Sequence, residues 1–193
     1  MFGITLTLLL KVVPMNCWKS VNLYRQYGTQ RIYITACAVA LFSFMVFTNL
    51  YERLFPSIYH YEYGLLPLLF TLITVLPIHK VLHCLPLWLT GKKAKIILLK
   101  KNKTPYLYCQ FSQTVSRAMM IVSVMTPLFM VIALSHISAF AFPHLTIFFI
   151  TFSAIHTGIC SLDVLYLGHL LKAPKSSYVE DVPSGFHILV KQS

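Results

Sequence analysis

Four long runs of apolar residues, separated by short polar stretches, dominate the pattern of this 193-residue chain. The runs cover residues 32–51, 65–89, 118–140 and 144–171. Each reaches the length of about 20 residues that a helix needs to cross the hydrocarbon core of a bilayer. The pattern therefore predicts an all-α integral membrane protein with about four transmembrane helices. Residues 1–193 are expected to form a single membrane domain, with residues 172–193 as a polar tail.

A different pattern lies between the second and third apolar runs. Residues 95–99 and 106–111 are short and β-prone, and the polar sequence Lys-Asn-Lys-Thr-Pro separates them. This arrangement predicts a small cytoplasmic β-hairpin. Its Lys-rich turn fits a solvated face that discourages edge pairing, and its edge also fits docking of an extended substrate. The short apolar run at 186–190 is expected either to add a strand to this hairpin or to cover the cytoplasmic mouth of the site.

Composition excludes a soluble domain and a nucleic-acid-binding protein. The chain is 57% hydrophobic and 11% charged, with a mean hydropathy of +0.71 and a net charge of +11. In a four-span topology, 14 of its 16 basic residues fall on one side, and the exceptions are Arg53 and Lys80. The positive-inside rule then predicts a multi-pass protein of the cell membrane with both termini in the cytoplasm. The 14 residues, which would attract anionic lipid headgroups, are Lys11, Lys19, Arg25, Arg31, Lys92, Lys93, Lys95, Lys100, Lys101, Lys103, Arg117, Lys172, Lys175 and Lys191.

The five cysteines do not indicate a disulfide framework. Their number is odd, there is no CxxC pair, and none lies clearly on the outer side of the expected topology. Most are expected to be buried thiols. They are Cys17, Cys37, Cys84, Cys109 and Cys160.

Three ionisable residues lie within the second apolar run. His79 and His83 are four residues apart, which places both rings on one face of a helix. The same spacing holds the two zinc ligands of HExxH metalloproteases, in which the residue after the first histidine is the general base. Here that residue is Lys80. The ligand pair is therefore present and the carboxylate base is missing.

Asp163 is the one acidic residue within an apolar run. His83 lies about 10 Å and Asp163 about 12 Å inside the same membrane boundary, if both runs are helical. His79, His83 and Asp163 together would supply three ligands for tetrahedral zinc, with the fourth position open. Cys160, one turn from Asp163, is expected to pack in the core rather than to bind metal.

These motifs resemble two groups of proteins. HxxxH in one core span and Asp163 in a later span resemble the site-2-protease group of intramembrane metalloproteases. The stretches CWKSVN…YG…RI, LPIHKVLHCLP and GxxSLD more closely resemble a family of small bacterial membrane proteins, best represented in bacilli, that is classed as zincin-type peptidases. The resemblance implies a zinc site of His79, His83 and Asp163 that cleaves a membrane-anchored peptide or protein.

Two positions depart from the resemblance. Lys80 replaces the catalytic glutamate, and Val164 stands where related proteases have glycine. Lys80 is then the candidate catalytic group, as a stabiliser of the oxyanion or as a neutral base. The alternative is a non-catalytic membrane protein that binds and regulates membrane partners, with a Lys80–Asp163 ion pair in place of metal. Packing of these residues without either role also remains open.

Overall fold

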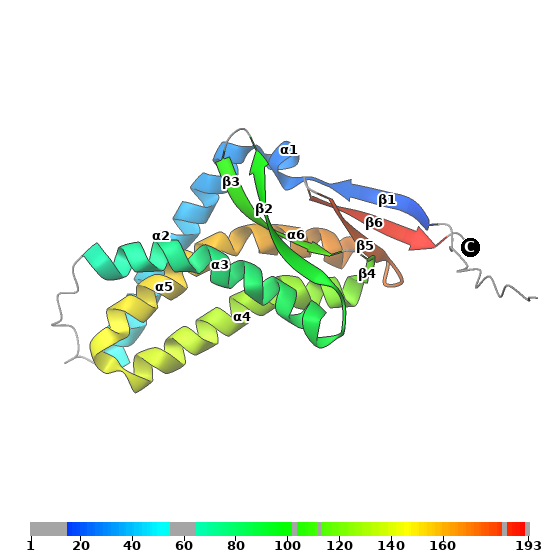
Figure 1. The fold of residues 1–193 in the computed structure, drawn as a ribbon. Coiled ribbons are helices and arrows are strands. Elements are labelled where there is room, and N and C mark those ends of the chain that lie inside the picture. Colours follow the sequence, from blue (N-terminus) through cyan, green and yellow to red (C-terminus); the bar gives the residue numbers. More distant parts are fainter. Residues whose placement is uncertain (1–14, 55–64, 102–103, 112, 183–184, 192–193) are drawn as a thin grey trace, which may run out of the picture.

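The computed structural model of the chain (Figure 1) describes residues 15–54, 65–101, 104–111, 113–182 and 185–191. In chain order its elements are β1 (Met15–Val21), α1 (Leu23–Tyr27), α2 (Thr29–Leu54), α3 (Leu65–Leu89), β2 (Ala94–Lys101), β3 (Thr104–Phe111), β4 (Val115–Ser116), α4 (Arg117–Ala141), η1 (Pro143–Leu145), α5 (Thr146–Ile159), α6 (Ser161–Lys172), β5 (Tyr178–Val182) and β6 (Gly185–Lys191).

The expected spans correspond to long helices, with one difference. Among the described residues, α2, α3 and α4 are each long and apolar enough to cross a membrane. The predicted span 144–171 is not one straight helix. It consists of η1 with α5, followed by α6 after a bend of 43° at Cys160, and this broken pair counts as a fourth candidate span.

The long helices expose many large apolar side chains and also bury a set of polar ones. Ile34, Ile73 and Phe129, for example, are 69%, 73% and 65% exposed. In a soluble protein such side chains are mostly buried, and a buried polar group is the informative exception. The buried polar residues of these helices are Ser43, Thr71, His79, His83, Ser123, Ser135, Thr146, Ser153, His156 and Asp163.

The prediction of an all-α fold is wrong, because the described chain also contains a four-stranded antiparallel sheet. Its strand order is β1-β6-β5-β4. β6 pairs with β1 from Met15↔Lys191 to Val21↔Phe186, and with β5 on its other side. One expectation was that the tail would add a strand to the hairpin. Instead, its strand β6 pairs with β1 at the start of the described chain. Such pairing between distant segments gives no local signal in a sequence.

The predicted hairpin is present between α3 and α4. β2 and β3 pair antiparallel from Ala94↔Phe111 to Lys101↔Thr104. An apolar cluster of Cys84, Leu87, Ala94 and Val115 packs the hairpin on the end of α3. A disulfide between Cys84 and Cys109 also joins α3 to β3, contrary to the expectation from the cysteine count.

The four-stranded sheet packs against the ends of α2, α4 and α6 (Figure 1). The buried cluster there includes Val21 of β1, Ile188 of β6 and Leu170 of α6. Arg117 of α4 fixes the end of α6, because its Nε donates to the carbonyl of Leu170 at 2.7 Å and its Nη2 to that of Leu171 at 3.1 Å. Terminal carbonyls of a helix lack partners within the helix, so this contact satisfies two of them. The sheet and Arg117 together hold the helix that carries Asp163.

Candidate metal centre

The face of α3 that points into the protein carries both histidines of the HxxxH motif. His79 and His83 are one helical turn apart and buried. Their rings meet edge to face, with centroids 4.6 Å apart, and their Nε2 atoms lie 3.1 Å from each other. α3 therefore presents two imidazole nitrogens to one point.

A second polar face crosses the bend between α5 and α6. His156, Cys160 and Asp163 follow one another at four and three residues, which places them on one side of a helix. The backbone hydrogen bonds Cys160 N–H to His156 O, at 2.9 Å, and Val164 N–H to Cys160 O, at 3.0 Å, continue the helical pattern through the bend. The three side chains thus reach α3 together, although the helix changes direction between them.

The first donor set, here called the Asp163 triad, consists of His79, His83 and Asp163. Asp163 Oδ2 lies 3.4 Å from His79 Nε2, and Oδ1 lies 3.4 Å from His83 Nε2. Two donors bound to zinc at 2.0–2.2 Å with a tetrahedral angle are about 3.3–3.6 Å apart. The spacing of the triad is close to these values, so the three residues fit a zinc ion without rearrangement of the helices.

The tautomer of His83 is set by its neighbour on α4. His83 Nδ1 lies 2.9 Å from the backbone carbonyl of Ser123, and a carbonyl oxygen can only accept a hydrogen bond. Nδ1 therefore carries the proton, which leaves a lone pair on Nε2 when the ring is neutral. The Ser123 hydroxyl in turn donates to the carbonyl of His83, so α3 and α4 are joined at this level in both directions.

The corresponding contact of His79 is with a third histidine. His79 Nδ1 lies 3.2 Å from His156 Nε2. A histidine that binds metal through one nitrogen usually donates a hydrogen bond from the other, and His156 can accept it. Both Nε2 lone pairs then face Asp163, whose Oδ2 is buried without a hydrogen-bond partner. A cation would complete this set of electron-rich atoms.

Lys80 does not contact Asp163. Among the ion pairs of the described residues, those of Asp163 are with His79 and His83, and none joins it to Lys80. The half-buried Lys80 ammonium instead acts on Asp163 electrostatically from a greater distance. The ion pair that was the metal-free alternative is therefore not formed in this structure.

A second carboxylate lies within the electrostatic reach of Lys80. Burial raises the pKa of Asp181 on β5 to about 6, and the Tyr108 hydroxyl, the Phe111 backbone and the Lys80 ammonium lower it by less. One of its oxygens, Oδ2, is buried without a hydrogen-bond partner. Sequence analysis did not connect Asp181 with the motif, because a strand of the tail brings it there.

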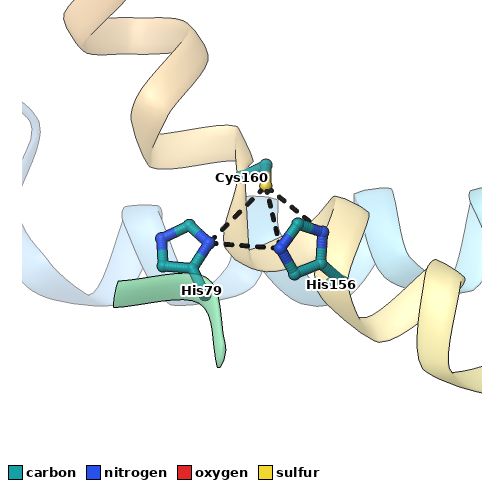
Figure 2. Close-up of side chains that lie close together, drawn as sticks. All are labelled: His79, His156 and Cys160. Carbon is teal, nitrogen blue, oxygen red and sulfur yellow. Dashed lines mark hydrogen bonds between the residues drawn. The ribbon is translucent and has the colours of Figure 1, made fainter. Parts of the chain in front are cut away.

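The second donor set, here called the Cys160 triad, consists of His79, His156 and Cys160 (Figure 2). Cys160 Sγ lies 3.8 Å from His79 Nδ1 and 3.7 Å from His156 Nε2. His156 was not among the residues expected at the site, and Cys160 was expected to pack in the core. The available signal was the interval of seven residues between His156 and Asp163, two helical turns within one apolar run.

Comparison with known proteins bears directly on this site. A family model with the description "Putative zincin peptidase" matches residues 72–178. The chain belongs to this family. The matched region contains all five side chains of the two triads. No curated protein and no solved structure matches the chain.

Proposed function

We propose that this protein is a zinc-binding membrane protein of the zincin type, whose site is the Asp163 triad and whose reaction is hydrolysis of a peptide bond. The observation that carries the proposal is the convergence of three electron-rich groups within 3.1–3.4 Å while each histidine makes an outward hydrogen bond through Nδ1. Membership in the zincin-type family supports the same metal.

Zinc held by the triad would supply the Lewis acidity that peptide hydrolysis requires. Residues of the chain orient the ligands and stabilise charge on the substrate. The Ser123 carbonyl keeps the lone pair of His83 directed at the site, and Lys80, next to a ligand, stabilises negative charge that develops on the substrate carbonyl. The side chains of His83 and Asp163 are 11% and 12% exposed, against 3% for His79. Substrate therefore approaches from the side of His83 and Asp163.

The proposed substrate is a membrane-anchored peptide or protein, since the site lies among helices apolar enough to be surrounded by membrane lipid. We further propose the cell membrane as the location, with the four-stranded sheet, both termini and the hairpin in the cytoplasm. The basic residues gather at this end of the helices, which supports that orientation. A reporter fused after Arg117 should give a cytoplasmic signal, and a periplasmic or extracellular signal there would contradict it.

Metal content tests the proposed site. Protein purified in detergent without chelator should hold about one zinc ion per chain, and His83→Ala or Asp163→Ala should remove most of it, because two ligands hold a divalent cation poorly. His136→Ala is the matched control: this histidine also lies on a long apolar helix, where its Nδ1 donates to the carbonyl of Ile132 at 2.8 Å. It should keep the zinc. Wild-type protein with far less than one metal per chain would contradict the proposal.

A second candidate function is a non-catalytic member of the family that binds and regulates membrane partners. The observation that favours it is the lysine at position 80, where zincins carry the glutamate that serves as general base. This candidate keeps the zinc site as a structural element. Substitution of Lys80 distinguishes the two, as described in the Discussion.

A further inference from the structure

His79 belongs to both donor sets, and it uses a different nitrogen in each. Its Nε2 faces His83 and Asp163, whereas its Nδ1 faces His156 and Cys160 (Figure 2). The two triads therefore lie on opposite edges of one imidazole ring. The proposed function uses the first edge and leaves the second edge with a histidine and a thiol.

The dimensions of the Cys160 triad are those of a metal site. Its nitrogen atoms are 3.2 Å apart, and its sulfur lies 3.8 and 3.7 Å from them. For zinc-like distances of about 2.1 Å to nitrogen and 2.3 Å to sulfur, tetrahedral geometry places these donors about 3.4–3.6 Å apart. Small rotations of the side chains would close the difference.

Burial distinguishes the two triads. His156 and Cys160 are 0% and 1% exposed, so an ion between them is out of reach of a substrate. The more exposed His83 and Asp163 lie on the other edge of His79. The Cys160 triad therefore suits retention of an ion rather than catalysis.

We propose that the Cys160 triad is a second metal-binding site, which binds a thiophilic divalent ion in place of zinc at the first site, the Asp163 triad. Binding there forms a bond between the metal and Cys160 Sγ and releases the thiol proton to solvent. A neutral imidazole has a lone pair on one ring nitrogen only, so His79 can bind a metal ion at one site at a time. The inference that the two sites exclude each other rests on the proposed zinc site. The second site does not depend on it.

The preferred ions follow from the donor atoms. Thiolate sulfur is a soft ligand that favours soft divalent ions such as Cd²⁺, whereas the carboxylate of Asp163 favours harder ions. Cd²⁺ is therefore expected to occupy the Cys160 triad and to displace zinc from the Asp163 triad. Such an ion would inhibit without any contact with substrate.

Cobalt absorption in full-length protein in detergent tests this inference without an activity assay. Co²⁺ bound to thiolate gives a near-ultraviolet charge-transfer band, whereas Co²⁺ bound to nitrogen and oxygen gives visible bands alone. Asp163→Asn, which lowers the metal affinity of the Asp163 triad, should strengthen the charge-transfer band because more cobalt then binds at Cys160. Cys160→Ser and Cys160→Ala should abolish it while visible bands remain, and Cd²⁺ affinity should fall by more than about tenfold in both. Cys37→Ser, a change at an exposed free cysteine, should leave the band unchanged.

The possible outcomes separate the two proposals. Bound cobalt without a charge-transfer band, in both wild type and Asp163→Asn, would contradict the second metal-binding site but not the proposed zinc site. A band that depends on Cys160, with no cobalt left bound in Cys160→Ser, would support the second site and overturn the first. Two cobalt ions bound per chain would contradict the inference that the two sites cannot be occupied at the same time. A failure of every variant to bind cobalt would overturn both proposals.

Discussion

Replacement of Lys80 by glutamate is expected to raise peptidase activity by about 10²–10⁴-fold, the usual contribution of a general base. The physical reason is local: residue 80 follows His79 on α3, at the edge of the Asp163 triad, where HExxH enzymes carry their carboxylate. The hydrogen bonds and ion pairs of His79, His83 and Asp163 do not involve Lys80, so the change should leave their geometry intact while zinc offsets the added negative charge. Cleavage of a membrane-anchored reporter, compared between wild type and Lys80→Glu, measures the gain.

Three further variants make this result interpretable. Lys80→Gln removes the charge without a base and should not gain activity. His83→Ala in the Lys80→Glu background should abolish the gain, because the metal is lost. If wild-type protein cleaves the reporter and Lys80→Ala abolishes cleavage, Lys80 itself works in catalysis and the non-catalytic candidate is wrong. The absence of cleavage in wild type and in a folded, zinc-loaded Lys80→Glu would contradict the hydrolytic proposal.

Substitution of Gly158 by alanine is expected to destabilise the protein by about 1–3 kcal/mol and to lower its metal content. A Cβ at this position would lie 2.5 Å from the backbone oxygen of Ala36 and 2.7 Å from the Cβ of Ala40. α2 and α5 therefore meet closely at small residues, as membrane helices commonly do. Because Ala36 contributes a backbone atom, the helices must separate, and α5 carries His156 two residues away.

Gly168→Ala is the matched control for this change. Gly168 lies in α6, and a Cβ added there would meet no atom within 4 Å. Alanine at this position should be neutral or should stabilise the helix by up to about 1 kcal/mol. Melting curves in detergent and zinc content per chain measure both variants. Equal behaviour of the two alanine substitutions would mean that the α2–α5 contact does not position the site.

The chain's long apolar helices were predictable because each fills an apolar run of about the length that a bilayer requires, and the hairpin because its two strands are adjacent in sequence. The four-stranded sheet was not predictable in the same way. β1 and β6 come from opposite ends of the described chain, and their register depends on packing over Leu170 and Ile32. Met15–Val21, with Trp18 and Lys19, also lacks the alternation of apolar and polar residues that predicts a strand. This is why the expected fold class lacked its sheet.

The candidate site shows the same division. His79, His83 and Asp163 could be proposed from their spacing and matched depth, since ionisable side chains are costly within apolar spans. His156 obeys the same physics, but the sequence gives no indication that its Nε2 meets Nδ1 of His79. The bend at Cys160, which brings residues of α5 and α6 to one point, depends on tertiary packing. Asp181 reaches this region through strand pairing of the tail.

With zinc at the proposed site, the contact of α3 with the α5–α6 face would also link the stability of the fold to the supply of metal. In each triad one side chain lies about 80 residues from the other two, so an unfolded chain offers no equivalent site with three ligands. By mass action, each tenfold rise in free metal above the dissociation constant adds about 1.4 kcal/mol to the free energy of unfolding. With zinc at the proposed site, the folded fraction of the protein would therefore rise and fall with the concentration of free metal.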